Sequence, residues 1–468
     1  MSEKTIKFIK NVGAMFIANG VSFLISALIT FIVPKVLDVE SYAYIQLYIF
    51  YTSYVSYLHY GWVDGIRLRY GGAYYEDLDK PLFGSQIWEY SILQMIVSFG
   101  VILGVSFFFD AGNRKIALLA VGICMLFRLP RLMPQYIMEM SNRIKECARI
   151  IIIERGIYLA LTCTVIWSGK TSVASLLLCD LAGQAISSAY AFWCCRDLVA
   201  TKPTKLTVST KEAWRNVSSG IKLTIANVSS LLIIGIIRMS IENQWDIETF
   251  GKISLTISIS NLLMVFIRAV AMVMFPTLRR INKDKLAAVY STMRLGIMLP
   301  LLGMLIVYYP LKVVMSIWLP QYAESLKYMA LLFPMCIFES KMSMLIETYL
   351  KTIRMEGWLL KINLITVSLS GVLAFITSYV LHNLTLAVLS IVILLAFRCV
   401  IAETVLSKKM NLDVKKLICL ELVLVAVFIF ASWYIDGIAG ELVYLAFYLA
   451  YLFLQRHEIK KNLKMVKK

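Results

Sequence analysis

The sequence predicts an all-α polytopic membrane protein with about fourteen transmembrane helices, in two parallel six-helix lobes followed by two extra C-terminal helices. Three observations predict this class: overall hydrophobicity, the recurrence of long apolar segments, and an internal repeat. Of the 468 residues, 59% are hydrophobic and only 16% are charged, and the mean hydropathy is +0.75. A soluble globular protein uses far less apolar material than this.

Apolar segments of about twenty residues, the length that crosses a bilayer as a helix, recur along the whole chain. The first one follows Lys4, Lys7 and Lys10, as in a signal peptide. It is longer than the apolar region of a signal peptide and no small-residue cleavage site follows it, so we expect it to remain in the mature protein. The predicted spans are residues 12–34, 41–63, 86–109, 116–138, 150–168, 171–195, 216–237, 249–275, 295–317, 328–350, 362–381, 384–406, 417–433 and 438–455.

Lysine and arginine lie mostly on one side of these spans. With the N-terminus assigned to the cytoplasm, the cytoplasmic segments carry 32 of these residues and the opposite side carries six. The positive-inside rule then predicts that both termini are cytoplasmic. The net charge of +18 is therefore mostly an orientation signal, and we expect membrane lipid but no nucleic acid as a partner.

An internal repeat relates residues 18–47 to residues 226–255. Without a gap, 10 of the 30 positions are identical, and VESYA in the first copy corresponds to IETFG in the second. Six predicted helices separate the copies, so both enter the membrane in the same sense, which is typical of transporters with two parallel lobes. We expect lobes at residues 1–200 and 201–412, and the two extra helices with a basic cytoplasmic tail at 413–468.

Nine basic side chains lie within the predicted spans, and six of them are candidates for a binding site. A charged group at the centre of a membrane helix costs roughly 2.5–3.5 kcal/mol, so such residues indicate function or pairing. All six fall in the cytoplasmic half, where they would line an inward-open cavity that suits a phosphate-bearing headgroup. Snorkelling to the interface and structural ion pairing are the alternatives for each. The six are Arg128, Arg131, Arg155, Lys222, Arg268 and Arg398.

The second span contains seven tyrosines between Tyr42 and Tyr60. Tyr51 and Tyr54 lie near its middle, where a ring and a hydroxyl group could contact a sugar. Packing between helices and location at the membrane interface are the alternatives. The nine cysteines and three histidines show neither a metal-ligand spacing nor a catalytic arrangement, so we expect no metal site, no cofactor and no catalytic residues.

Three segments resemble the polysaccharide-transport (Wzx-type) flippases: NGVSFLISALITFIVPKVLDVESYAYIQLY, the following YGWVDGIRLRYGGAYYED, and the repeated IETFGKISL. Their superfamily also contains the multidrug and toxin extrusion proteins and the lipid II flippase. The resemblance covers the whole chain in helix layout. It is specific in sequence over the first hundred residues and again over residues 214–280.

This resemblance implies that the chain moves an undecaprenyl-pyrophosphate-linked oligosaccharide repeat unit across the bacterial cytoplasmic (inner) membrane, for the synthesis of O-antigen, capsule or exopolysaccharide. The diphosphate would lie against the cations and the lipid tail beside helices 13 and 14. The resemblance also implies coupling to a proton or sodium gradient, and polysaccharide polymerase and chain-length machinery as partners. The acids within spans that would carry the coupling, or serve as structural partners, are Asp180, Glu339 and Glu421.

Two other functions remain open. A multidrug exporter of the same fold would use acids in its cavity to bind cations, whereas this chain offers mostly bases without local acidic partners. A membrane polysaccharide polymerase or ligase would be an enzyme, and such enzymes need a sizeable external loop. Every predicted external loop is about ten residues or shorter, so we expect a transporter and not an enzyme.

Overall fold

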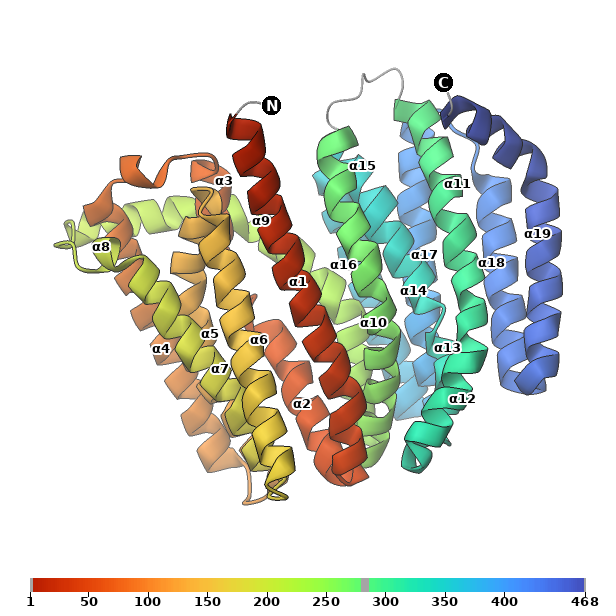
Figure 1. Cartoon of the computed structure of the whole chain (residues 1–468), viewed down its shortest axis with the longest axis horizontal. Coiled ribbons are helices and arrows are strands. Elements are labelled where there is room, and N and C mark those ends of the chain that lie inside the picture. Colours follow the sequence, from red (N-terminus) through yellow and green to blue (C-terminus); the bar gives the residue numbers. More distant parts are fainter. Residues whose placement is uncertain (1–2, 279–285, 467–468) are drawn as a thin grey trace. The chain divides into compact units, whose positions relative to one another are not determined.

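The computed structural model describes the backbone of residues 3–278 and 286–466, and side chains within 13–264, 286–355 and 357–456 except residues 14, 16 and 263. Helices connected by short turns make up this part of the chain, and it contains no strand (Figure 1). Twelve helical segments in it are long and apolar enough to cross a membrane. The predicted class, an all-α polytopic membrane protein, is confirmed.

The chain forms two compact units, Met1–Val228 and Ser229–Lys468. The boundary lies within α9 (Leu206–Gln244), so this helix begins in the first unit and ends in the second. The lobe boundaries expected from the sequence, at residues 200 and 412, remain a prediction.

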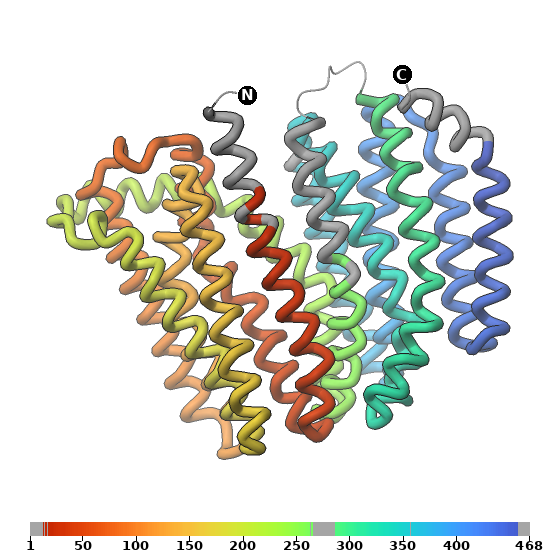
Figure 2. The backbone as a smooth tube through the Cα atoms, viewed as in Figure 1, coloured from red at the N-terminus to blue at the C-terminus, as the bar shows by residue number. Residues whose placement is uncertain are grey.

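In the first unit, α5 packs against α4, α7 and α2, and α6 packs against α7 and α1. Figure 2 shows α5, α6 and α7 as neighbouring helices. The segments before α9 are α1 (Glu3–Val36), α2 (Val39–Val55), α3 (Trp62–Tyr70), a 3-10 turn (Tyr75–Asp77), α4 (Lys80–Phe108), α5 (Asn113–Met140), α6 (Ile144–Trp167), α7 (Val173–Cys194) and α8 (Arg196–Val199).

Local sequence explains where several of these helices begin. The Asp79 side chain accepts a hydrogen bond from the backbone N–H of Leu82, and a proline follows in the first turn of α4. Ser172 and Ser175 form a reciprocal capping box at the start of α7. Such contacts satisfy N–H groups that have no partner within the helix.

The second unit combines long helices with several short or wider-wound ones. Its elements are α10 (Ile247–Leu278), α11 (Leu286–Met304), a 3-10 turn (Leu305–Val307), α12 (Tyr308–Trp318), 3-10 turns (Pro320–Tyr322 and Ser325–Tyr328), α13 (Met329–Leu332), α14 (Met335–Ser340), a π-helix (Lys341–Ile346), α15 (Glu347–Thr352), α16 (Glu356–Ala374), a π-helix (Phe375–Val380), α17 (Leu384–Lys409), α18 (Lys415–Phe430), a π-helix (Ala431–Ile435) and α19 (Gly437–Val466). Segments 286–318 and 325–352 each serve as one span.

Twelve of the fourteen predicted spans correspond to these twelve segments, and the other two fall on α2 and α10. Helix α2 is shorter than the predicted span 41–63. Its 17 residues end at Val55, and Tyr60 and Gly61 then adopt left-handed backbone conformations with φ of 51° and 82°. At the helical rise, 17 residues reach about 25 Å, less than the roughly 30 Å of a bilayer core.

The internal repeat appears as equivalent helix boundaries. Helix α1 ends at Val36 and α2 begins at Val39, while α9 ends at Gln244 and α10 begins at Ile247. Both boundaries recur after 208 residues, the offset that the sequence repeat predicts.

Candidate functional site

A buried ion pair joins α5, α6 and α7 in the first unit. Arg131 Nη1 lies 2.7 Å from Glu154 Oε2, and Arg131 also donates a hydrogen bond to Ser187 Oγ. Gln184 Nε2 donates to Glu154 Oε1 over 3.1 Å. Arg131 is 4% exposed and Glu154 is 7% exposed. Arg131 on α5 is therefore held by Glu154 on α6 and Ser187 on α7.

Two further arginines surround this pair. Arg155 Nη2 lies 3.7 Å from Glu154 Oε1, and the Arg155 side chain is 29% exposed. Arg128 is half-buried and attracted electrostatically to Glu154, but it forms no direct ion pair with any described residue. Asp180, which attracts Arg155, accepts a hydrogen bond from Tyr48 Oη over 2.6 Å. The first-unit cluster, defined as Arg128, Arg131, Glu154, Arg155 and Asp180, thus carries three bases and two acids.

Lys222, Tyr51 and Tyr54, the other first-unit residues predicted from the sequence, take no part in this cluster's ion pairs. Lys222 on α9 is exposed and forms no ion pair within the described part of the chain. Tyr51 and Tyr54 are half-buried on α2, with ring centroids 5.1 and 5.3 Å from that of Phe50. Arg268, on α10, lies outside the described side chains.

A polar network that the sequence did not predict joins α3 to the first half of α9. Asp64, 2% exposed, accepts a hydrogen bond from Thr224 Oγ1 over 2.8 Å. Glu212 accepts one from Tyr70 Oη and forms an ion pair with Arg69, each at 2.6 Å. Burial and the hydrogen bond to Glu212 raise the pKa of Tyr70 to about 12. These contacts attach the first half of α9 to α3 within the first unit.

The second unit contains a buried ionic cluster of Arg294, Lys341, Glu403 and Glu421. Arg294 lies 2.7 Å from Glu403 through Nε and 2.8 Å from Glu421 through Nη1. Lys341 Nζ forms ion pairs with both carboxylates, at 2.7 Å for Glu421 Oε2. Tyr290 Oη donates to Glu403 over 2.9 Å. No side chain of the cluster is more than 4% exposed, so each charge depends on the opposite charges around it.

Arg398 occupies a second ionic site in this unit. It is 1% exposed, and its two Nη atoms lie 3.2 Å from Glu339 and 3.2 Å from Glu347. Its Nε donates to Asn363 Oδ1 over 2.9 Å. The side chains of Glu339 and Glu347 are each 22% exposed, so the acids of this site reach further outward than the arginine.

Arg131, Arg155 and Arg398 form ion pairs, which is the alternative of structural pairing that the sequence left open for each of them. The partners of Arg131 and Arg398 are on other helices, which spacing along one helix does not reveal. Arg294, Lys341 and Glu347 were not among the residues predicted from the sequence. Lys341 lies inside the predicted span 328–350 and could have been found by its position, whereas Arg294 lies one residue outside a predicted span. Among the described residues, no group of side chains could hold a metal ion.

Several solved transporter structures are similar to this chain. The lipid II flippase MurJ in an inward closed conformation aligns with a TM-score of 0.62 and 13% identity, covering 96% of this chain and 100% of its own. An inward-facing multidrug resistance MATE family transporter of the MOP superfamily aligns with a TM-score of 0.59 and 11% identity, covering 86% and 96%. A MATE in complex with MaL6 aligns with a TM-score of 0.55 and 12% identity, covering 86% and 97%.

No protein-family model matches the chain, and neither does any curated protein sequence. At these identities the structural alignments establish the fold alone, which this chain shares with the MATE family transporter and with MurJ.

Proposed function

We propose that the chain is a flippase that moves undecaprenyl-pyrophosphate-linked oligosaccharide repeat units across the bacterial cytoplasmic membrane, as the Wzx-type family does. The observation that carries the proposal is the surplus of arginine in the first-unit cluster. Three guanidinium groups face two carboxylates inside spans, where an uncompensated charge is costly. An anionic ligand that enters the site would balance the surplus.

The arginines have different tasks in this proposal. Arg131 is held by Glu154 and Ser187 and forms the rigid base of the site. Arg128 has no direct acidic partner in the described part of the chain, and Arg155 is partly exposed, so their guanidinium groups bind the diphosphate. Arginine suits this task because its planar fork donates paired hydrogen bonds to phosphate oxygens. Lys222 and Arg268 extend the cationic surface, Arg398 contributes to it when Glu339 is protonated, and Tyr51 and Tyr54 contact the sugars.

The helix layout supports a lipid-linked substrate. The structure of the lipid II flippase MurJ aligns with 96% of this chain, whereas the two MATE structures align with 86%. In the proposal, two parallel lobes rock around a central cavity, and α18 and α19 accommodate the lipid tail. Both termini lie in the cytoplasm, and polysaccharide polymerase and chain-length machinery receive the product outside.

Gradient coupling is part of the same proposal. Asp180 and Glu339 are partly accessible acids whose protonation or sodium binding would change the charge of the two sites. Glu421 is enclosed by Arg294 and Lys341, so it takes part by exchanging partners within the buried ionic cluster.

Multidrug export is the second candidate function, and the second unit provides the observation in its favour. In the Arg398 site, Glu347 also pairs with Lys351 at 3.1 Å, whereas Glu339 pairs with Arg398 and its side chain is 22% exposed. A partly exposed acid of this kind would attract a cationic drug. An enzymatic role has less support, because the structures similar to this chain are transporters and flippases.

Deletion of the gene in the native host tests the proposal when surface polysaccharide and lipid-linked intermediates are measured together. The flippase predicts lost polysaccharide and complete single repeat units trapped on the cytoplasmic side, with recovery on complementation. Single units displayed outside without long chains would indicate a polymerase. Unchanged polysaccharide together with new drug sensitivity would overturn the proposal in favour of the exporter.

A further inference from the structure

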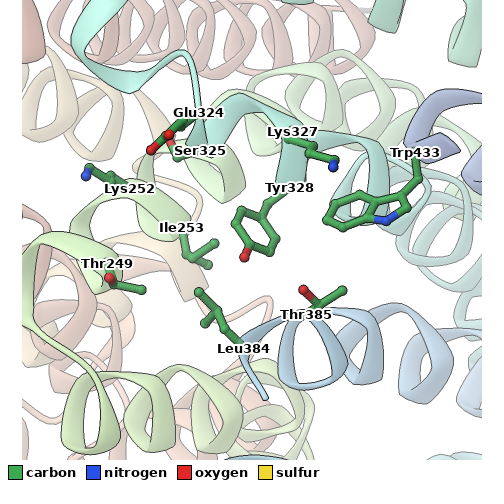
Figure 3. Close-up of a pocket in the computed structure, with 10 residues that line it drawn as sticks. All are labelled: Thr249, Lys252, Ile253, Glu324, Ser325, Lys327, Tyr328, Leu384, Thr385 and Trp433. Carbon is green, nitrogen blue, oxygen red and sulfur yellow. The ribbon is translucent and has the colours of Figure 1, made fainter. Parts of the chain in front are cut away.

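A pocket of about 420 Å³ lies in the second unit, and none of its lining residues belongs to either ionic site. Four separate chain segments form it: the start of α10, the turn before α13, the start of α17, and the π-helix that follows α18. Figure 3 shows their side chains converging on one space. The lining residues are Thr249, Lys252, Ile253, Glu324, Ser325, Lys327, Tyr328, Leu384, Thr385 and Trp433.

Aromatic rings form one wall of the pocket. The ring centroids of Tyr328 and Trp433 lie 5.7 Å apart at 56°, and Lys327 Nζ lies 4.6 Å from the Trp433 centroid. In Figure 3 the Tyr328 ring lies between Ile253 and Trp433, near the middle of the lining residues. An aromatic face next to polar groups suits a ligand with alternating apolar and polar surfaces, and a sugar ring has such surfaces.

The remaining wall offers hydrogen bonds and a positive balance of charge. Thr249, Ser325 and Thr385 provide hydroxyl groups; those of the two threonines can donate and accept, whereas Ser325 Oγ donates to the Tyr322 carbonyl oxygen over 2.7 Å and can only accept from a ligand. Lys252 and Lys327 are the lining bases and Glu324 is the lining acid. Just outside the lining, Glu248 pairs with Lys252 at 3.7 Å and Asp436 attracts Lys327, so Lys327 Nζ, over the Trp433 ring, is the more available ammonium group. Figure 3 places the two lysines on opposite sides of Tyr328, so a ligand between them would meet an ammonium group at each end. This arrangement favours a carboxylate over a neutral or cationic ligand.

We infer that this pocket binds an acidic saccharide, with a sugar ring on Tyr328 and Trp433 and a carboxylate on Lys252 or Lys327. The volume falls within the range of about 300–1,000 Å³ that is usual for small-ligand sites. Helix α19 begins beside the pocket, after Trp433, and runs toward the C-terminus at the other end of the unit. If the termini are cytoplasmic, as the proposed function holds, the pocket faces outward, where a transported repeat unit leaves.

Binding to the purified full-length chain in lipid nanodiscs tests the inference without requiring transport. The probes are an oligosaccharide that contains glucuronic acid and its carboxyl-reduced neutral counterpart, titrated by calorimetry. We expect the acidic probe to bind at least about tenfold more tightly, and Trp433→Ala and Lys327→Gln each to weaken it by about tenfold. Equal affinity for the two probes, or no binding of either, would overturn the inference.

The chain offers a matched control at another Lys–Trp contact. Lys361 Nζ lies 5.3 Å from the ring centroid of Trp358, which is 46% exposed, and neither residue lines the pocket. Trp358→Ala and Lys361→Gln should leave acidic-probe binding unchanged, and an equal loss in these variants would count against the assigned pocket. Trp433→Phe keeps an aromatic face and should retain most of the affinity, which separates ring contact from a folding defect.

A second arm identifies the source of the saccharide. The same acidic oligosaccharide is presented free and as a polyprenyl-diphosphate conjugate, and the effect of Trp433→Ala is measured for each. A loss in either form supports the pocket, and the form that binds more tightly shows whether the natural ligand is lipid-linked or free. This result is independent of the deletion experiment, so the pocket and the flippase can fail separately.

Discussion

Asp38 and Asp246 cap equivalent helices 208 residues apart in the chain. Asp38 Oδ2 accepts a hydrogen bond from the Ser41 backbone N–H over 2.9 Å, and Asp246 Oδ1 accepts one from the Thr249 N–H over 2.6 Å. The most similar part of the internal repeat is therefore a helix-start signal. It stops one membrane helix and begins the next at the same place in both units.

Removing either cap should destabilise the protein. Asp38→Ala and Asp246→Ala leave an N–H group without its partner, which costs about 1 kcal/mol for a helix N-cap. Asn at either position retains an acceptor and should behave like the wild type. Thermal unfolding of the purified protein measures the effect. Asp110→Ala is the control, because Asp110 is exposed and forms no hydrogen bond or ion pair within the described part of the chain.

The cap at Asp38 should also make stability depend on pH. The hydrogen bond from the Ser41 N–H lowers the pKa of Asp38 below its ordinary value of 3.8. A carboxyl group with a lower pKa in the folded state contributes stability above its unfolded pKa and loses that contribution as pH falls through the folded pKa. The unfolding temperatures of the wild type and Asp38→Asn should differ by a constant amount at neutral pH. That difference should change below about pH 4, and a constant difference down to pH 2 would contradict the prediction.

Glycine is required where α3 packs against α9. A Cβ atom on Gly65 would lie 1.8 Å from the backbone oxygen of Asn216, and one on Gly220 would lie 2.0 Å from that of Gly61. Gly65→Ala and Gly220→Ala should therefore separate the helices and disturb the hydrogen bond between Asp64 and Thr224. We expect a loss of several kcal/mol or a failure to fold, as for other overpacked contacts.

The control for these glycines lies on α4. A Cβ atom at Gly100 would meet no heavy atom within 4 Å, so Gly100→Ala should be tolerated or stabilising. Yield and unfolding temperature, measured for the variants side by side, decide between a steric requirement and a general effect of alanine. Equal behaviour of Gly65→Ala and Gly100→Ala would exclude the steric explanation.

The helix layout could be predicted from the sequence because length, hydrophobicity and helix caps are local properties. The end of α2 could not, because the turn depends on left-handed backbone at Tyr60 as well as at Gly61. Tyrosine recurs along this apolar segment, so Tyr60 carries no turn signal of its own. The predicted span 41–63 therefore continued past Val55.

The ion-pair partners could not be predicted from the sequence, for a different reason. Arg398 pairs with Glu339 and Glu347, which precede it by 59 and 51 residues, on helices that meet it only in the folded unit. Sequence spacing identified the intramembrane charges but not which opposite charges reach them. The candidate residues were therefore partly predictable as a set, whereas their pairing required tertiary structure.

The buried ionic cluster should respond to the loss of one carboxylate more strongly than to the loss of a complete pair. Glu403→Gln leaves Arg294 and Lys341 with Glu421 alone, and a buried charge without compensation costs about 3–5 kcal/mol. We expect a large drop in unfolding temperature and in the yield of folded protein. Glu403→Gln with Lys341→Met removes one positive and one negative charge and keeps the contact between Arg294 and Glu421, so it should recover much of the loss.

The two single variants and the double variant form a thermodynamic cycle, which isolates the interaction between Glu403 and Lys341. Additive losses would mean that the two residues act independently despite their contact. Lys361→Met is a suitable control for the lysine substitution, because Lys361 is exposed and does not belong to the cluster.

Arg128 and Arg131 lie one helical turn apart but should respond differently to substitution. Arg128→Ala removes a half-buried cation that has no direct acidic partner in the described part of the chain, so stability should change by no more than about 0.5 kcal/mol. If Arg128 binds the diphosphate, transport should fall by about tenfold or more, because hydrogen bonds to charged groups contribute about 1.5–3 kcal/mol.

Arg131→Ala should lower both stability and transport, since it leaves Glu154 with Arg155 at 3.7 Å as its ion-pair partner. Arg131→Met with Glu154→Gln should recover stability, and continued loss of transport in this stable double variant would show that Arg131 serves the substrate as well as the fold. Transport is measured as restored surface polysaccharide at equal protein amounts, and full transport by Arg128→Ala would remove Arg128 from the headgroup site.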